Sequence, residues 1–376
     1  MEELIEEIKN KKILHWNYRG FNELPQVFKN YGHDVREIYL KENKLTCLPP
    51  WICDFNNLTN LYLSGNKLNI FPDELCQMKQ LLVIDLCDNN IELLPNSIQN
   101  LCNLRQLLLD DNYLNQLPSE LIKLECLEIL SLARNNLISL PEWLGSLKKL
   151  DKLIVDNNYL EEIPNRLTLA CSLTTISIKS NRLRYLPLNS FISPVNIYFD
   201  CNPNVNYLSY SILCQLLELG WEDGKNCLIN ECKLVMSASK NIKLLVNLCG
   251  IKGDKKDIIE LPRQLFQVFG EDIKIPVSLW ELSLRNLYKN KEDDFFDKYY
   301  TLKHDIFYNL LSNGPISICL NSHCREPIFT EAWIVVGKSE ECVFLVITLF
   351  CSQNCASSFD FPSHGIETLS WDYYDG

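Results

Sequence analysis

The stretch Leu127-Glu128-Ile129-Leu130-Ser131-Leu132-Ala133-Arg134-Asn135-Asn136-Leu137 decides the fold of this chain. Its pattern, L-x-x-L-x-L-x-x-N-x-L, recurs along the sequence, and a proline preceded by an apolar residue closes each unit. The first spacing between these prolines is 24 residues and every later spacing is 23; they are Pro25, Pro49, Pro72, Pro95, Pro118, Pro141, Pro164 and Pro187. A fixed period of this length predicts stacked structural repeats rather than a single globule.

Each residue type in the unit has a structural reason. The alternating Leu130 and Leu132 predict a short strand with one buried face. One unit cannot bury that face alone, so neighbouring units must stack. The asparagine after the strand carries both a donor and an acceptor for the backbone of a buried turn. That position is occupied by Asn43, Asn66, Asn89, Asn112, Asn135, Asn158 and Asn181. We interpret these residues as structural and not as site residues.

The unit resembles the leucine-rich repeat in its 23-residue intracellular form, over residues 11–205. The resemblance implies an α/β solenoid, a curved parallel β-sheet horseshoe of about eight or nine repeats. The first unit departs from the pattern, because Arg19 replaces the asparagine and Trp16 a leucine, as expected of a terminal repeat. Residues 1–10 are acidic and predict a helical N-terminal cap.

Composition narrows the class of protein. The chain has 376 residues, enough for more than one domain, and a net charge of −12 that argues against nucleic acid or an anionic membrane as partner. No apolar run approaches the roughly 18 residues of a transmembrane helix. Secreted relatives of the repeat family carry clustered cysteine caps, whereas the 17 cysteines here are scattered. The sequence therefore predicts a cytoplasmic protein, with the nucleus as a second compartment.

The residues between the inward leucines would line the concave face of the horseshoe, where solenoids bind partners. We expect a protein partner there, at a surface with an acidic middle and basic flanks. For any single residue, an ordinary solvated strand position is the alternative. The candidate partner-binding residues are Tyr39, Tyr62, Asp85, Leu108, Asp110, Asp111, Ile154, Asp156 and Tyr198.

The period fails after residue 205. Residues 206–314 are expected to form a closing and helical region, in which residues 206–220 predict a closing helix and residues 276–313 further helix. Cys227 and Cys232 lie in this region at a C-x4-C spacing. They could form half of a metal site, but the sequence offers no convincing other half.

Two further cysteine pairs bracket a β-like stretch. Cys319 and Cys324 precede it, and Cys351 and Cys355 follow it. Four thiolates around a hairpin could hold zinc tetrahedrally, so we predict a structural Zn2+ with no open position for catalytic water. The predicted unit is an α+β, treble-clef-like zinc module over residues 315–362, followed by an acidic tail over residues 363–376. Two alternatives stay open: buried free thiols, and His323 in place of Cys319 or Cys324.

Repeats, helices, the segment Ser322–Phe329 and the segment Phe350–Cys355 occur together in this chain. This combination resembles the leucine-rich repeat-containing protein 28 family and, more distantly, the protein 58 family. The resemblance covers most of the chain and implies a cytosolic protein without catalytic activity. The chain departs from that pattern in its first cysteine pair and in the tail after Phe361.

One predicted helix has a second interpretation. Leu279, Ser283 and Leu287 fit the degenerate pattern by which substrate adaptors dock elongin-cullin ubiquitin ligases through an apolar ridge. The alternative is an amphipathic core helix with Leu279, Leu282 and Leu287 turned inward.

Motifs for catalysis are missing from the sequence. It contains no glycine-rich phosphate loop, no H-E-x-x-H and no G-x-S-x-G. We therefore predict a non-enzymatic scaffold for protein binding, with adaptor function as the alternative.

Overall fold

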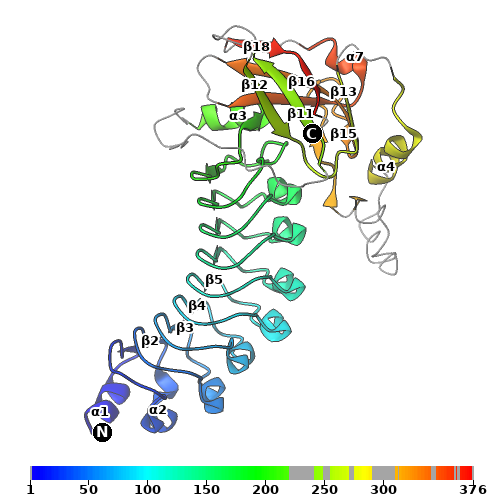
Figure 1. Ribbon diagram of the computed structural model, residues 1–376. Helices are drawn as coiled ribbons and strands as arrows, with labels where there is room; N and C mark the ends of the chain where they lie inside the picture. The colour runs from blue at the N-terminus through cyan, green and yellow to red at the C-terminus, as the bar shows by residue number, and fades with distance from the viewer. Residues whose placement is uncertain are drawn as a thin grey trace. The chain divides into compact units, whose positions relative to one another are not determined.

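The computed structural model describes residues 2–219, 241–248, 255–270, 275–289, 310–311, 313–339, 344–359, 361 and 365–374. The chain forms two compact units (Figure 1). The first comprises Met1–Glu161, Ala170–Asn181 and Val195–Phe199, and the second comprises Glu162–Leu169, Arg182–Pro194 and Asp200–Gly376. Among the described helices, none is long and apolar enough to cross a membrane.

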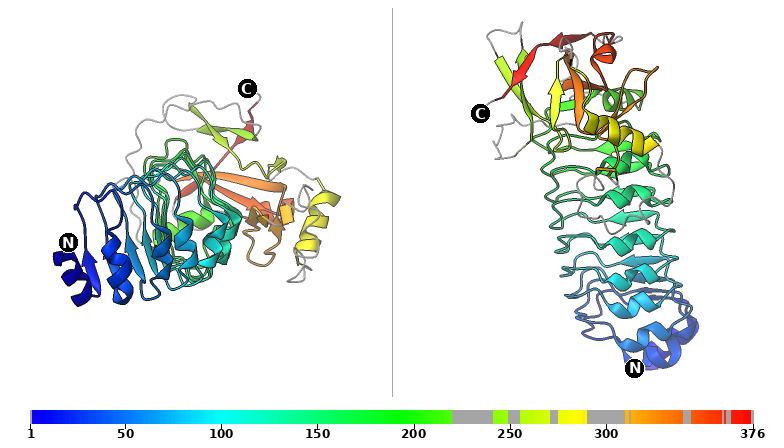
Figure 2. Two further views of the ribbon diagram at one scale, coloured as in Figure 1. Left: turned by 90° about the horizontal axis from the view of Figure 1, so that it is seen from below. Right: turned by 90° about the vertical axis from the view of Figure 1, so that its right-hand side faces the viewer.

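The first unit is built on a nine-stranded parallel sheet whose strand order follows the sequence (Figure 2). Its strands are β1 Ile13–His15, β2 Glu37–Tyr39, β3 Asn60–Tyr62, β4 Val83–Asp85, β5 Gln106–Leu108, β6 Ile129–Ser131, β7 Lys152–Ile154, β8 Thr175–Ser177 and β9 Asn196–Tyr198. The central residues pair in register, so that Leu130 lies between Leu107 and Leu153, and all three are fully buried. The predicted solenoid with a parallel sheet is confirmed.

Short helical turns form the return arms of the repeats. They are α2 Gln26–Tyr31, η1 Gly32–Asp34, η2 Pro50–Asp54, η3 Asp73–Gln77, η4 Asn96–Asn100, η5 Ser119–Lys123, η6 Glu142–Ser146 and, in the second unit, η7 Asn165–Leu169. Except in η1, a proline carbonyl starts each of these turns, as where Ile98 N donates to Pro95 O at 3.1 Å. Ahead of the first repeat lies helix α1, Glu2–Asn10, whose Glu7 accepts a hydrogen bond of 3.2 Å from the buried Trp16 indole.

The asparagines bind backbone of two successive repeats rather than one another. Asn112 Nδ2 donates to Leu86 O at 2.9 Å in the preceding repeat and to Leu109 O at 3.1 Å in its own, while Oδ1 accepts from Ile91 N at 2.9 Å. The preceding residue, Asp111, has a φ of 54°, a left-handed value that recurs at this position along the stack. The amide therefore satisfies polar groups that the tight, buried turn would leave unpaired.

The second unit contains three sheets and three described α-helices. A five-stranded sheet has the order β10-β17-β16-β13 with β18 also paired to β16, a three-stranded sheet has the order β12-β11-β19, and β14 pairs with β15. The strands are β10 Tyr207–Ser209, β11 Lys243–Leu248, β12 Lys255–Glu260, β13 Gln267–Phe269, β14 Ser317–Ile318, β15 Pro327–Ile328, β16 Glu331–Ser339, β17 Leu345–Phe350, β18 Ile366–Leu369 and β19 Trp371–Tyr373; the helices are α3 Tyr210–Glu218, α4 Leu279–Lys289 and α7 Gln353–Ala356.

One apolar core joins segments for which separate regions were expected. Tyr207, Leu244, Val268 and Trp333 are buried in the same cluster, which therefore spans residues 206–314 and 315–362. Residues 206–220 are not all helical, because Tyr207 pairs with Leu345 as part of β10 before α3 begins. Within residues 363–376, β18 and β19 pair with β16 and β11. Cys227 and Cys232 lie outside the described residues.

Candidate metal centre and interaction surfaces

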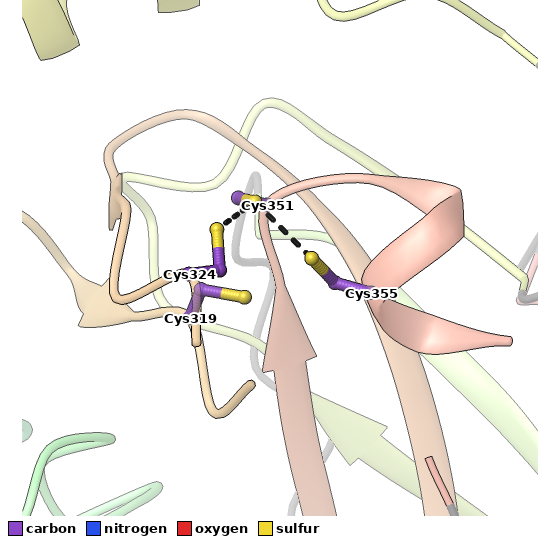
Figure 3. Close-up of side chains that lie close together, drawn as sticks. All are labelled: Cys319, Cys324, Cys351 and Cys355. Carbon is purple, nitrogen blue, oxygen red and sulfur yellow. Dashed lines mark hydrogen bonds between the residues drawn. The ribbon is translucent and has the colours of Figure 1, made fainter. Parts of the chain in front are cut away.

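The four cysteines of the predicted zinc module meet in the structure (Figure 3). Their sulfur atoms all lie within 4.8 Å of one another. Cys351 Sγ is 3.3 Å from Cys324 Sγ and 3.8 Å from Cys355 Sγ. These separations exceed a disulfide bond of about 2.05 Å. Four ligands about 2.3 Å from a tetrahedral zinc ion would lie about 3.8 Å apart, so the cluster would need only a small adjustment to hold one.

Two loop segments bring the thiols together. Cys319 and Cys324 follow β14, where Asn321 O accepts hydrogen bonds from Cys324 N at 3.0 Å and from Arg325 N at 3.1 Å. Cys351 follows β17, and Cys355 lies in α7. The tight turn over Cys324 takes a left-handed residue, Arg325, with a φ of 55°. Such a turn points both sulfurs of the first pair to one side.

His323 lies outside this group. It is exposed, its Nδ1 is 3.3 Å from Ser322 Oγ, and the group that could hold a metal consists of the four cysteines. Of the alternatives raised by the sequence, the structure thus brings Cys319 and Cys324 together with the second pair, and leaves the imidazole apart.

Two of the four thiols, those of Cys351 and Cys355, have raised pKa values. The hydrogen bond with Cys319, followed by burial, raises the pKa of Cys351 above its ordinary range, and burial raises the pKa of Cys355. Four soft sulfur donors without an oxygen ligand favour zinc or another thiophilic metal over calcium or magnesium. A metal that binds here must displace the thiol protons.

In helix α4, three leucines expected to face the core are exposed, and two charged residues are buried. Leu279, Leu282 and Leu287 are 80%, 47% and 38% exposed, so the interpretation with these leucines inward is wrong. Glu281 is fully buried and Arg285 is 5% exposed. Glu281 and Arg285 were missed in the sequence, although an acidic and a basic residue four positions apart on a helix are the usual spacing of an ion pair.

Stacked aromatic rings lie at the first end of the strand face. The rings of Tyr39 and Tyr62 are 4.3 Å apart and tilted by only 7°, and His15 stacks on Tyr39 at 4.8 Å. Beside them Lys41 Nζ lies 2.7 Å from Asp85 Oδ2. At the other end, Lys179 Nζ lies 5.0 Å from the ring centre of Tyr198. Leu108 and Ile154 are half-buried between these ends.

The aspartates of the strand face are bonded within the repeats. Asp110 accepts hydrogen bonds from Ser131 Oγ at 2.6 Å and from Ala133 N at 2.7 Å, and burial raises its pKa despite them. Two repeats on, Asp156 accepts from Ser177 Oγ at 2.9 Å and from Lys179 N. A third aspartate of this face, Asp111, forms an ion pair with Arg134. The recurrence of serine 21 residues after an aspartate was a signal in the sequence for these bonds.

Comparisons with known proteins agree on the repeats. Leucine rich repeat family models match residues 57–78 and 102–160, which identifies these segments as leucine-rich repeats. A comparison with curated proteins finds no match.

Two solved structures are similar to part of this chain. The leucine-rich repeat protein LIC12759 of Leptospira interrogans is 25% identical over 61% of this chain and 64% of that chain, with a TM-score of 0.49. Internalin C2 of Listeria monocytogenes is 27% identical over 41% of this chain and 66% of that chain, with a TM-score of 0.38. Each match spans less than two thirds of the other protein.

Proposed function

We propose that this leucine-rich repeat chain is a non-enzymatic scaffold whose strand face binds a protein partner and whose second unit carries a structural zinc ion. The observation that carries the scaffold is the continuous row of outward side chains on nine parallel strands. Solenoids use such rows as extended binding surfaces. We further propose a cytoplasmic location and kinship with the protein 28 and protein 58 families, on the motifs quoted above.

Within the strand face, the aromatic and aliphatic residues are the proposed contacts. Tyr39 and Tyr62 offer stacked rings, and Leu108, Ile154 and Tyr198 continue the row. Apolar and aromatic side chains of this kind supply most of the binding energy at protein interfaces. The carboxylates of Asp85, Asp110, Asp111 and Asp156 are engaged within the solenoid, and they shape the charge of the surface more than they offer unpaired acceptors.

The test compares two variants in which arginine replaces aliphatic residues on different faces of the repeats. Leu108→Arg with Ile154→Arg alters the strand face, whereas Ile138→Arg alters an exposed position outside the strands, where Ile138 is 62% exposed. Proximity labelling with the full chain should identify partner proteins that disappear in the first variant. The second variant should label the same partners as the parent chain. Identical partner sets in all three chains would refute the proposed surface.

The zinc proposal rests on the fit of four sulfurs to a tetrahedral site. Cys319, Cys324, Cys351 and Cys355 would supply all four ligands, which leaves no coordination position for a catalytic water. The ion would cross-link the loop after β14 to the end of β17 and to α7. Its role in this proposal is therefore structural.

A second candidate function is that of a substrate-recognition adaptor for an elongin-cullin ubiquitin ligase. The outward position of Leu279 and Leu287 on α4, with Ser283 half-buried between them, favours it. A helix docks in a groove through such an apolar ridge. Co-purification with elongin should be abolished by Leu279→Asp and kept by Ile275→Asp, a nearby exposed position outside the helix. Elongin that still co-purifies with Leu279→Asp would exclude this helix.

A further inference from the structure

Helix α4 packs through a small apolar cluster and through polar contacts. Leu284 is fully buried in that cluster with Leu310, Leu311 and Phe329, and the half-buried Tyr288 packs against it. The other buried residues of the helix, Glu281 and Arg285, are charged. A helix seated by two buried charges depends on the positions of their partners, because an unpaired buried charge is strongly unfavourable.

Those partners lie on both halves of the cysteine cluster. The Glu281 carboxylate accepts hydrogen bonds from Phe329 N at 2.9 Å and from Thr330 N at 2.8 Å, in the chain that leads on from Cys324. The Arg285 guanidinium donates two hydrogen bonds of 3.3 Å to the carbonyl oxygen of Cys351. Near the end of the helix, Lys289 pairs with Glu326, two residues beyond Cys324.

We propose that metal binding at the four cysteines controls how α4 is presented, so that the exposed face of Leu279, Trp280 and Leu282 is set only in the metal-loaded chain. This inference rests on the proposed zinc site and deepens the proposed interaction function by adding its regulation. The ligand class is a thiophilic divalent cation.

The physical reason is that one ion would lock the two segments that hold the helix. Sulfur atoms as far as 4.8 Å apart must come within about 3.8 Å of one another around zinc. That change moves the Cys351 carbonyl and the Cys324 loop together. Loss of the ion removes the direct link between the Cys324 loop and the chain after Phe350, although the pairing of β16 with β17 remains. This loosens the hydrogen bonds from Arg285 to Cys351 O and the Lys289–Glu326 pair.

The core of the second unit does not depend on the ion in the same way. Strand β16 pairs with β13, β17 and β18, and its side chains Trp333, Ile334 and Val336 lie in the large apolar cluster. The proposal therefore predicts a local response, in which α4 loosens while β16 keeps its protection.

Hydrogen exchange followed by mass spectrometry on the full chain tests this directly. The chain is compared zinc-loaded, stripped by a chelator, and reloaded with zinc, with metal content measured in each state. Exchange in residues 279–289 should quicken by at least about tenfold on stripping and recover on reloading. Exchange in β16 and in the solenoid strands β5 and β6 should stay unchanged as internal controls.

Each other outcome overturns the inference in a recognisable way. Zinc loss without any change in α4 overturns the control of α4 and leaves the metal site standing. Equal loss of protection in α4 and β16 shows a general scaffold metal and not a local control. A chain that takes up no zinc overturns the metal site and this inference together. Elongin binding is not needed for any of these readouts.

Discussion

The carboxylate of Glu281 accepts a 3.0 Å hydrogen bond from Arg285 Nε one helical turn later, and the two side chains are 0% and 7% exposed to solvent. Burying two charges is costly unless their hydrogen bonds are complete. Glu281 meets that condition, because two backbone amides and the Thr330 hydroxyl also donate to it. Burial of the pair and of Leu284 leaves Leu279, Leu282 and Leu287 on the exposed side of α4.

Removing one partner of this pair should be strongly destabilising. Arg285→Met is expected to cost the second unit about 3–5 kcal/mol, because Glu281 would stay buried without a counter-charge. The double variant Glu281→Gln with Arg285→Met should lose less than the sum of the two single-variant losses, because either single change already breaks the pair. Urea unfolding followed by circular dichroism measures both. Additive losses would mean that the two residues act independently.

The metal site predicts one zinc ion per chain by elemental analysis of the purified full-length protein. Cys351→Ser should reduce zinc to near zero, because it removes one of the four sulfur ligands. The matched control is Cys102→Ser, an exposed cysteine of the repeats, which should keep its zinc. Full zinc occupancy in Cys351→Ser would contradict the assignment of the four ligands.

Burial of Asp110 predicts a pH effect on the stability of the repeats. Its pKa in the folded chain is raised from 3.8, mainly by burial. The folded state therefore holds this proton more tightly than the unfolded state, and the associated stability, present below pH 3.8, is lost as pH rises through the raised pKa.

The stability of Asp110→Asn relative to the parent chain should accordingly increase as pH rises from acid to neutral. The increase should be less than about 1 kcal/mol, because the group is partly exposed to solvent screening. Thermal unfolding at a series of pH values measures the difference. Asp88→Asn, which removes the same charge at an exposed position, is the control for net charge. A loss of relative stability with rising pH would give the opposite sign and contradict the prediction.

Replacing a buried asparagine of the stack should lower the free energy of unfolding more than replacing an exposed one. Asn112→Ala would leave Leu86 O, Leu109 O and Ile91 N without the side-chain partner they have now. The expected cost is about 1–3 kcal/mol. Asn115→Ala, at an exposed position of the same repeat, should cost less than about 0.5 kcal/mol by the same chemical denaturation. Equal losses would show that the buried amide has no special role.

The spacing of the cysteines in the sequence predicted the thiol cluster, but it did not predict which side chains contact that cluster. Two cysteine pairs around a β-like stretch were visible, and the hairpin of β16 and β17 brings them together. The contact of Arg285 with Cys351 O joins residues 66 positions apart, and no periodic pattern signals it. On the strand face, Lys41 and Asp85 are likewise 44 residues apart, so the candidate residue was visible and its ion partner was not.

The sequence by itself determined the solenoid, because the strand pairs and asparagine bonds that build it join neighbouring repeats. The asparagine bonds recur at separations of 3, 21 and 26 residues, so one consensus read along the chain predicts all of them. In the second unit, burial depends on contacts without a period. Only the tertiary structure decided that β10 and β18 join one sheet and that α4 buries Glu281. The amides of Phe329 and Thr330 are what make that burial favourable, and they lie 48 and 49 residues away.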